Sequence, residues 1–364
     1  MITKQHGTLK AKSISLLFLL SLFSTTATTY GQNASNLFDF SEDVRVFTAY
    51  AMMNAAGNGG EWRRAGMDAI RSQLRSDLAG RVDSSFEAKL RAFNQSHGRI
   101  LETYEAALLT SGPPDFHWSY DRKTTGEIGE DVSSDSALPA LLAEFYNKAN
   151  VAQLWDEYQP LIQAENDKYK PFADKAMEEV LSYCRLDSNY FYSDSRLIHF
   201  EYMPILPYFT SMTAWINGQV YFIVGPQEQK PDQSIFYYLL LNRVTFPLVK
   251  KNSRDVQRLA GLFNAVKSKL DMKDGNWNRL VAECFSEAMD MRLQKRLYDL
   301  SDSTVQASLM TEYKYGFILC PTIYSDLAKY ESSGVSFTEY FPKILKSIDY
   351  HHEIEKWNNF WGKE

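Results

Sequence analysis

Histidine, cysteine and carboxylate side chains are the groups with which this chain could hold a metal ion or move a proton. The sequence has six histidines, His6, His97, His117, His199, His351 and His352. No two of them stand in an HxH or HxxxH arrangement, so no pair is placed on one face of a strand or helix. The histidines therefore predict no metal site. His199 lies in a strand-like run and is expected to be a half-buried, hydrogen-bonded residue.

Other catalytic signatures are also missing from the sequence. There is no G-x-S-x-G nucleophile motif. The glycines of AAGNGGEW (55–62) follow a helical pattern and lack the lysine of a phosphate-binding loop. Cys184, Cys284 and Cys320 have no CxxC spacing and apolar neighbours, so cysteine-bound zinc is not supported. Three buried free thiols, or one disulfide and one free thiol, are both compatible with the sequence.

The first 31 residues have the layout of a secretory signal. Lys4, Lys10 and Lys12 precede the apolar run SISLLFLLSLF, and small and polar residues follow up to Gly31. The apolar run is shorter than the roughly 20 residues that a membrane-spanning helix needs. We therefore expect a signal peptide at 1–31 and an exported protein, periplasmic or extracellular, with no transmembrane span after cleavage.

The charge balance bears on the class of partner. The formal net charge is −6, and loss of 1–31, which has three lysines and no acidic residue, would bring it to −9. Phosphates of nucleic acids and anionic lipids bind surfaces rich in Lys and Arg, so the composition argues against nucleic acid as a partner. Apolar residues make up 45% of the 364 residues, which is enough for a substantial core.

Hydrophobic periodicity divides the rest of the chain at about residue 185. The spacing over 32–185 is helical and predicts a helical N-terminal region. Between 190 and 226 the pattern becomes aromatic and β-branched, and Asn217-Gly218 is a hairpin signal. We expect two or three strands in a small antiparallel sheet within a mostly helical α+β fold. Later helices are predicted over 235–250, 253–270, 276–298, 303–315, 320–331 and 337–348.

One of these predicted helices has no polar face in its first two turns. Every residue from Ile235 to Leu241 (IFYYLLL) is apolar or aromatic. A helix that is apolar all round is buried all round. The segment is therefore predicted to be a central helix between the small sheet and the later helices.

Several stretches in a fixed order extend this interpretation. They are ILPYFTSMTAWINGQVYFIVGPQ, PDQSIFYYLLLNRVTFPLV, WNRLVAECFSEAMDMRL and YGFILCPTIYSDLAKYESSGVSFTEYFPKIL. Their order and spacing resemble a bacterial family of exported, largely uncharacterised zincin-like domains. The resemblance covers the C-terminal half and, more loosely, the helical N-terminal half. It implies a zincin-like region over 186–364, in which the central helix carries His-Glu-x-x-His and a later helix supplies a glutamate.

Aligned on Pro247, the family motif falls on residues that lack its chemistry. The first histidine position is Tyr238, the glutamate is Leu239 and the second histidine is Asn242; the later glutamate falls on Glu283. In working zincins the histidines bind zinc and the adjacent glutamate takes a proton from the metal-bound water. Phenol and amide groups replace imidazole poorly, and leucine accepts no proton. The resemblance thus implies zinc in intact relatives, and here a remnant site with no metal and no catalytic residue.

Glu283 is the one motif position that keeps its residue type. Either it is a solvated carboxylate paired with Arg279, or it faces inward toward Tyr238 and Asn242. In the second case the phenol and the amide would donate hydrogen bonds to the carboxylate. Two charged residues are predicted to support the remnant site, Arg243 and Glu287.

The sequence therefore favours an exported, non-catalytic zincin-like protein, a pseudo-metallopeptidase with a binding or envelope-associated role. Its partner would be an unknown peptide or protein. Two alternatives stay open: an active zinc metallopeptidase with unorthodox ligands, and a purely structural helical envelope module. Stoichiometric zinc and chelator-sensitive cleavage would favour the first alternative. Partner binding that survives mutation of the cleft would favour the second.

Overall fold

A small β-sheet separates two hydrophobic cores in the described part of the chain. The structure, a computed structural model, describes residues 37–57, 69–97, 100–119, 137–193, 197–206, 211–216, 219–227, 230–270 and 275–362. They belong to one compact unit, Gln32–Glu364. The predicted signal peptide lies outside the described residues.

The sheet has four strands in the order β1-β2-β4-β3. The strands are β1 (Phe38–Asp39), β2 (Ile198–Tyr202), β3 (Ser211–Ile216) and β4 (Gln219–Val224). β3 and β4 form an antiparallel hairpin, as the Asn217-Gly218 signal predicts, although these two residues lie outside the described ones. β1 and β4 both run parallel to β2. The sheet is therefore mixed, and the expectation of an antiparallel sheet is wrong for two of its three pairings.

Two features of the chain produce the mixed sheet. β1 comes from the N-terminal region and is too short to leave a periodic pattern; it pairs through Phe38 and Asp39 with Ile198 and His199. After β2 the chain reaches the far edge of the sheet first, so that β4 returns between β2 and β3. A hairpin signal concerns only strands that are consecutive in sequence, so it could not indicate either parallel pairing.

Alternate strand residues enter the two cores, because successive side chains of a strand point to opposite faces. Ile198, Phe200 and Val220 belong to the core shared with the C-terminal helices, whereas Ile223 and Met212 belong to the core shared with the N-terminal helices. The N-terminal helices are α1 (Val44–Ala55), α2 (Ala69–Leu78), α3 (Ser84–His97), α4 (Ile100–Leu108) and α6 (Ala137–Lys148). The sheet is thus covered on both faces.

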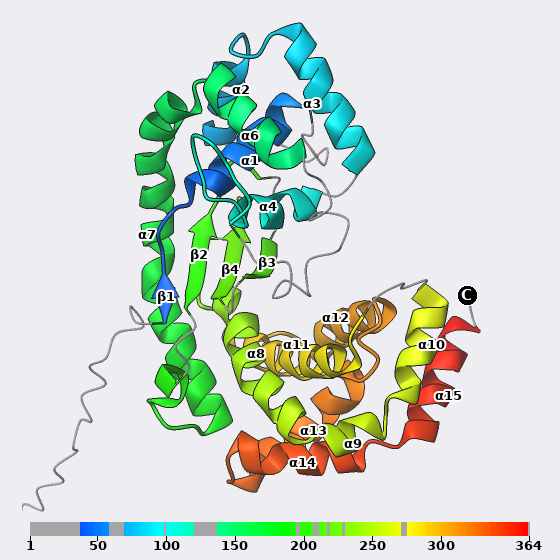
Figure 1. The fold of residues 1–364 in the computed structure, drawn as a ribbon. Coiled ribbons are helices and arrows are strands. Elements are labelled where there is room, and N and C mark those ends of the chain that lie inside the picture. The colour runs from blue at the N-terminus through cyan, green and yellow to red at the C-terminus, as the bar shows by residue number, and fades with distance from the viewer. Residues whose placement is uncertain are drawn as a thin grey trace, which may run out of the picture. The chain divides into compact units, whose positions relative to one another are not determined.

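One long helix, α7 (Val151–Cys184), contributes to both cores and runs alongside the sheet (Figure 1). Leu154 and Ile162 of its first half lie in the N-terminal core. Ala176 and Val180 of its second half lie in the C-terminal core. The helix therefore links the two cores across the sheet.

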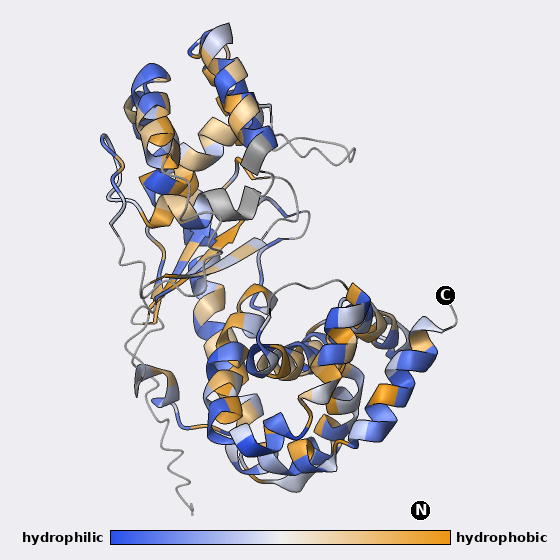
Figure 2. Ribbon diagram, turned by 45° about the vertical axis from the view of Figure 1, so that its right-hand side comes forward, coloured by the Kyte–Doolittle hydropathy of each residue, from blue (hydrophilic) through white to orange (hydrophobic). Residues whose placement is uncertain are grey.

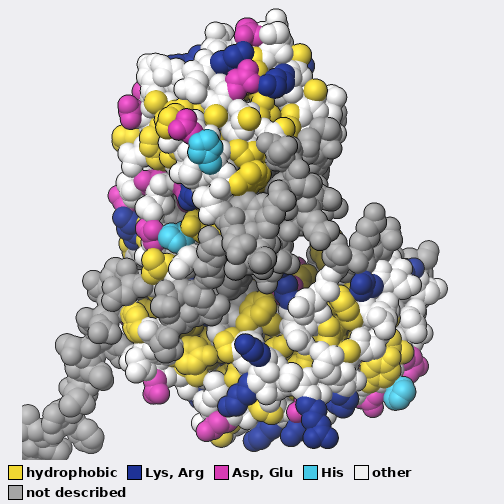
Figure 3. Space-filling view, in the orientation of Figure 1, with side chains coloured by type: hydrophobic (Ala, Val, Ile, Leu, Met, Phe, Trp, Pro, Cys, Tyr) yellow, Lys and Arg dark blue, Asp and Glu magenta, His cyan; other side chains and the backbone are white. Residues whose placement is uncertain are grey.

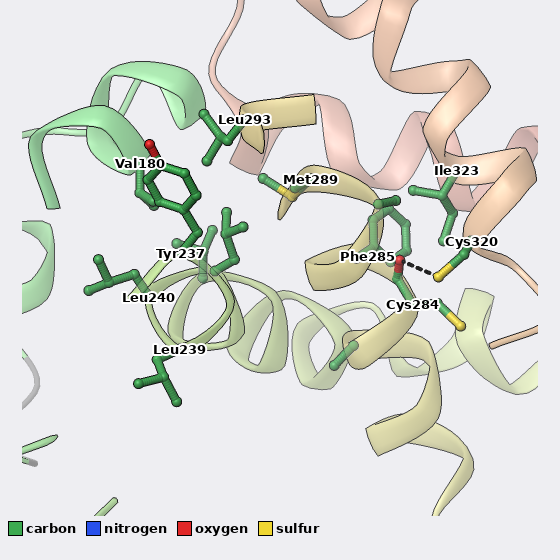
Figure 4. Packing of buried hydrophobic residues seen from close by; sticks show 14 of the residues in the cluster. Val180, Tyr237, Leu239, Leu240, Cys284, Phe285, Met289, Leu293, Cys320 and Ile323 are labelled. Carbon is green, nitrogen blue, oxygen red and sulfur yellow. Dashed lines mark hydrogen bonds between the residues drawn. The ribbon is translucent and has the colours of Figure 1, made fainter. Parts of the chain in front are cut away.

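The apolar run of the sequence forms the first half of α8 (Ser234–Lys251), which is buried on most sides. Phe236 packs edge-on against Phe38 of the sheet, with ring centroids 5.1 Å apart. Figure 4 shows Tyr237 directed toward Val180 of α7 and Leu239 directed away from it. Full burial of each large apolar side chain contributes roughly 1.5–3 kcal/mol. Packing on several sides therefore explains why this helix has no polar face.

The C-terminal core is completed by a set of helices with mixed hydropathy along their length (Figure 2). They are α9 (Ser253–Gln257), α10 (Gly261–Leu270), α11 (Trp277–Tyr298), α12 (Asp302–Lys314), α13 (Cys320–Ser333), α14 (Phe337–Ser347) and α15 (Tyr350–Trp361), and a short 3-10 helix, η2 (Tyr190–Ser193), precedes β2. The predicted helix 253–270 is divided in two, and α15 was not predicted. A Cβ added to Gly261 would lie 2.6 Å from the Tyr350 hydroxyl, so glycine permits the close approach of α15 to α10.

Two smaller expectations concern membranes and cysteines. Among the described residues, no helix combines the length and the apolar character that crossing a membrane requires. Cys184, Cys284 and Cys320 are all buried free thiols. Cys320 Sγ donates to the backbone carbonyl of Cys284, 3.3 Å away (Figure 4). Of the two cysteine states compatible with the sequence, the structure has the one without a disulfide.

Candidate functional site

The residues of the predicted remnant site lie on α8 and α11, two helices that pack against each other. α11 begins at Asn276, whose side chain accepts hydrogen bonds from the backbone N–H groups of Asn278 and Arg279. Its apolar stripe, which includes Val281 and Ala288, enters the C-terminal core. The polar residues of α11 beside this stripe are thereby held next to α8.

Tyr238 and Leu239 lie on α8 at the positions expected for the first histidine and the general base. Tyr238 is half-buried, and Leu239 is 4% exposed. Burial raises the pKa of the Tyr238 phenol, and the negative charge of Glu283 raises it further. A side-chain hydrogen bond with Asn242 acts in the opposite direction. The phenol is therefore a neutral hydrogen-bonding group at physiological pH.

Asn242 lies inside the α8–α11 interface with two hydroxyl side chains. Its side-chain oxygen accepts a hydrogen bond from the Ser286 hydroxyl of α11 at 2.9 Å. The Thr245 and Ser286 hydroxyl oxygens are also 2.9 Å apart. The three side chains, which we call the Asn242 cluster, are at most 5% exposed. Buried polar groups are costly unless they are paired, so this pairing stabilises the contact between the two helices.

Glu283 pairs with Arg279, one turn earlier on α11. Arg279 Nε donates to Glu283 Oε1 at 2.8 Å, and the Glu283 side chain is only 16% exposed. Of the two orientations left open by the sequence, the Arg279 pair is the one present, although the carboxylate is not fully solvated. Glu283 affects Tyr238 through its charge.

Three further carboxylates, Glu287 and Asp290 of α11 and Glu312 of α12, form what we call the acidic cluster. Burial, and then the charges of Asp290 and Glu312, raise the pKa of Glu287 to about 8. Burial also raises the pKa of Asp290 to about 7, although Gln294 donates to its Oδ2 at 3.0 Å. The pKa of Glu312 is raised by burial as well. Glu287 and Asp290 therefore titrate near neutral pH.

The side chains of the remnant site are a poor donor set for zinc. Zinc takes imidazole, thiolate or carboxylate ligands. Tyr238 offers a protonated phenol, the side-chain oxygen of Asn242 already accepts from Ser286, and Glu283 is bonded to Arg279. In the part of the chain that the structure describes, no three His, Cys, Asp or Glu residues are grouped so that they could hold a metal ion. The arrangement favours hydrogen bonding.

Sequence reasoning missed several polar partners in this interface. Ser286 and Asp290 interrupt the apolar stripe of α11, and Thr245 lies on the buried side of α8. Helical periodicity assigns these three positions to the core. A polar residue at a core position is the signal that could have identified them. Of the two predicted supporting residues, Arg243 is 5% exposed on α8, and Glu287 belongs to the acidic cluster.

His199, His351 and His352 lie outside the α8–α11 pair. His199 on β2 is half-buried, its Nδ1 lies 2.9 Å from Asp39 Oδ2, and its ring stacks on Tyr221 with centroids 4.5 Å apart. This is the half-buried, hydrogen-bonded residue that the sequence predicts. His351 and His352 are exposed in the first turn of α15.

Comparison with known proteins found a family model that matches the region containing α8 and α11. Residues 202–347, from the end of β2 through α14, match the model of a family described as Domain of unknown function (DUF4932). The matched region is less than half of the chain but contains every residue of the remnant site. No curated protein matches the chain, and no solved structure does. The match supports an uncharacterised family for this region.

Proposed function

We propose that this chain is an exported, non-catalytic zincin-like protein that acts by binding a peptide or protein partner in the periplasm or outside the cell. The observation that carries the proposal is the Asn242 cluster. It occupies the position where the resemblance places the second zinc-binding histidine. The neutral Asn242 amide accepts from the Ser286 hydroxyl, which also bonds to the Thr245 hydroxyl, and this gives α8 and α11 a link that needs no metal.

The neighbouring positions support the same proposal. A working zincin needs a proton acceptor beside its first histidine. That position is Leu239, which is buried in the C-terminal core and accepts no proton. The Tyr238 phenol, whose pKa is raised, supplies no base either.

Surface chemistry is compatible with a binding role. Figure 3 shows hydrophobic side chains among polar and charged ones on the face of the molecule that carries α8. A protein that keeps the central helix and loses the metal chemistry can still present such a surface to a partner.

Elemental analysis and a peptidase assay on one preparation test the proposal. The purified protein is expected to contain less than about 0.1 equivalent of zinc per chain and to cleave neither casein nor a mixed fluorogenic peptide library. Addition of zinc or a chelator should change nothing. One equivalent of zinc, together with cleavage that a chelator stops and Glu283→Gln removes, would overturn the proposal. Glu355→Gln is the matched control, because it removes the same charge from an exposed position on α15.

A further inference from the structure

A cavity of about 770 Å³ opens between α7, the start of α8 and the ends of α11 and α13. Its volume lies within the range of small-molecule and peptide sites, roughly 300–1,000 Å³. Tyr237 and Leu293 contribute a buried apolar part of its lining, and Figure 4 shows the two side chains close together. None of the remnant-site residues lines this cavity.

The charged side chains of one wall are held by hydrogen bonds and by one ion pair. Arg296 lies 2.9 Å from Glu331, and the Tyr183 hydroxyl donates to the same carboxylate at 3.2 Å. The guanidinium of Arg185 donates to the backbone carbonyls of Glu331 and Val335, at 2.7 and 2.6 Å. These groups satisfy one another at the C-terminal end of α13. They frame the cavity, and because the two guanidinium groups outnumber the single carboxylate, this wall is cationic.

The opposite wall, on α7, has a carboxylate without an ionic partner. Glu179 accepts hydrogen bonds from the Tyr237 hydroxyl and from Gln233 Nε2, the latter at 3.2 Å. Among the described residues, no Lys or Arg lies within ion-pair distance of Glu179. Burial raises the pKa of Glu179, Lys175 partly offsets this, and the charges of Asp232 and Glu178 add to the increase. A cation brought close to a desolvated carboxylate in such surroundings would stabilise its charged form.

The charged side chains on the α7 side of the cavity also favour a cationic ligand. Once the Arg185–Arg296–Glu331 group is set aside, the charged lining residues are Lys175, Glu178 and Glu179. The first two are exposed and belong to no ion pair among the described residues. The α7 wall therefore has a net charge of −1, whereas the opposite wall, with Arg185, Arg296 and Glu331, has a net charge of +1. The cationic end of a ligand would lie on the α7 side, beside an apolar floor that suits an aliphatic side chain. Lysine and arginine side chains combine an aliphatic stem with a cationic end.

We propose that this cavity is a binding site for a lysine or arginine side chain of a partner peptide, with the Glu179 carboxylate as its anchor. The inference rests on the proposed binding function and names the site and the chemistry of the partner. The stem of the bound side chain lies against Tyr237 and Leu293, and its cationic end pairs with Glu179. Glu178 adds a weaker, more exposed attraction.

Calorimetric titration with blocked tripeptides tests this assignment. The probes are Ac-Leu-Lys-Leu-NH₂, Ac-Leu-Arg-Leu-NH₂ and Ac-Leu-norleucine-Leu-NH₂, which keeps the stem but has no charge. At least one cationic peptide should bind about tenfold or more tightly than the norleucine peptide. Comparison of the lysine and arginine probes tells which cation the site prefers. Equal binding of all three, or no binding of any, overturns the proposal.

Variants of the lining residues locate the site. Glu179→Gln keeps an acceptor for Tyr237 and should weaken cation binding about tenfold, while binding of the norleucine peptide stays unchanged. Glu178→Gln should weaken it less than threefold, and the control Glu355→Gln not at all. Ser182→Trp, at an exposed lining position, should block all three peptides without a change in the melting temperature. Cation selectivity that survives Glu179→Gln in a folded protein contradicts the assignment.

The same samples separate this inference from the proposed function. Mass spectrometry of the peptides after titration shows whether they were cleaved. Chelator-sensitive cleavage would refute the proposed function, whatever the cation selectivity of the cavity. Intact peptides without selectivity would refute only the cavity assignment.

Discussion

The Asn242 cluster and the acidic cluster are adjacent on α11, yet their buried polar groups differ: those of the first are neutral and hydrogen-bonded, and those of the second are ionisable. Ser286 and Glu287 are consecutive residues. The Asn242 cluster is neutral, and its hydrogen bonds link α8 to α11. The acidic cluster holds ionisable groups, whose pKa values burial and mutual repulsion raise. The first arrangement should stabilise the fold at any pH, whereas the second should stabilise it only when protonated.

Removal of the Asn242 side chain from the Asn242 cluster is expected to have the largest effect on the free energy of unfolding. Asn242→Ala removes the side-chain oxygen that accepts from the Ser286 hydroxyl inside a helix interface. An unsatisfied buried polar group costs about 1–3 kcal/mol, and the volume left empty adds to this. We expect the free energy of unfolding, measured by urea denaturation, to fall by about 2–3 kcal/mol.

The control for this change is Asn359→Ala, an exposed asparagine on α15. It should alter the free energy of unfolding by less than about 0.5 kcal/mol. An equally small effect of Asn242→Ala would remove the distinction between the two clusters.

Replacement of the acidic-cluster carboxyl groups by amides should change the free energy of unfolding by a smaller amount, which depends on pH. Folded-state pKa values of about 8 for Glu287 and about 7 for Asp290 lie above their ordinary values of 4.5 and 3.8. Between about pH 4 and pH 8 the folded state therefore holds protons that the unfolded state has released, and stability decreases as pH rises through this window. Glu287→Gln/Asp290→Asn removes this loss. The double variant should exceed the wild type by about 1–3 kcal/mol at pH 8.

Urea denaturation at pH 5, 6, 7 and 8 gives the two stability curves. Their difference should shrink toward pH 5, where the wild-type carboxyl groups are protonated in the folded state. Glu355→Gln should follow the wild-type curve. Parallel curves for the double variant and the wild type would show that these carboxylates do not titrate as their burial requires.

Glu283 belongs to neither cluster, and its substitution should have the smallest effect on the free energy of unfolding. Its partner Arg279 is about half-exposed, and exposed ion pairs one turn apart on a helix contribute about 0.3–0.5 kcal/mol. Glu283→Gln and Arg279→Gln should each lower the free energy of unfolding by about that amount in denaturant titrations at low salt. A loss above about 1.5 kcal/mol for Glu283→Gln alone would place this carboxylate in a buried hydrogen-bonded cluster with Tyr238 and Asn242.

Local patterns predicted the parts of the fold that depend on local chemistry. The apolar run from Ile235 to Leu241 predicted a buried central helix, and α8 is one. The Asn217-Gly218 pair predicted the β3–β4 hairpin. The pairing of the two-residue β1 with β2 depends on a contact between distant segments, which no local pattern encodes. α15 was missed although its N-cap Asp349 accepts from His351 and His352 N–H groups, a signal that the sequence offered.

The site stays a prediction, and the hydrogen bonds among its residues could not be predicted from the sequence. The resemblance named Tyr238, Asn242 and Glu283, and the structure brings all three to the α8–α11 interface. Which polar side chains meet there depends on how the two helices are rotated against each other. Ser286 therefore emerged as the partner of Asn242 only from the packing.

Zinc titration of the purified protein by calorimetry tests the central claim most directly. The account predicts that zinc at micromolar concentration gives no one-to-one binding heat and no change in melting temperature, and that Asn242→Ala and Glu283→Gln titrate like the wild type. Tight one-to-one zinc binding that both substitutions abolish would contradict the account.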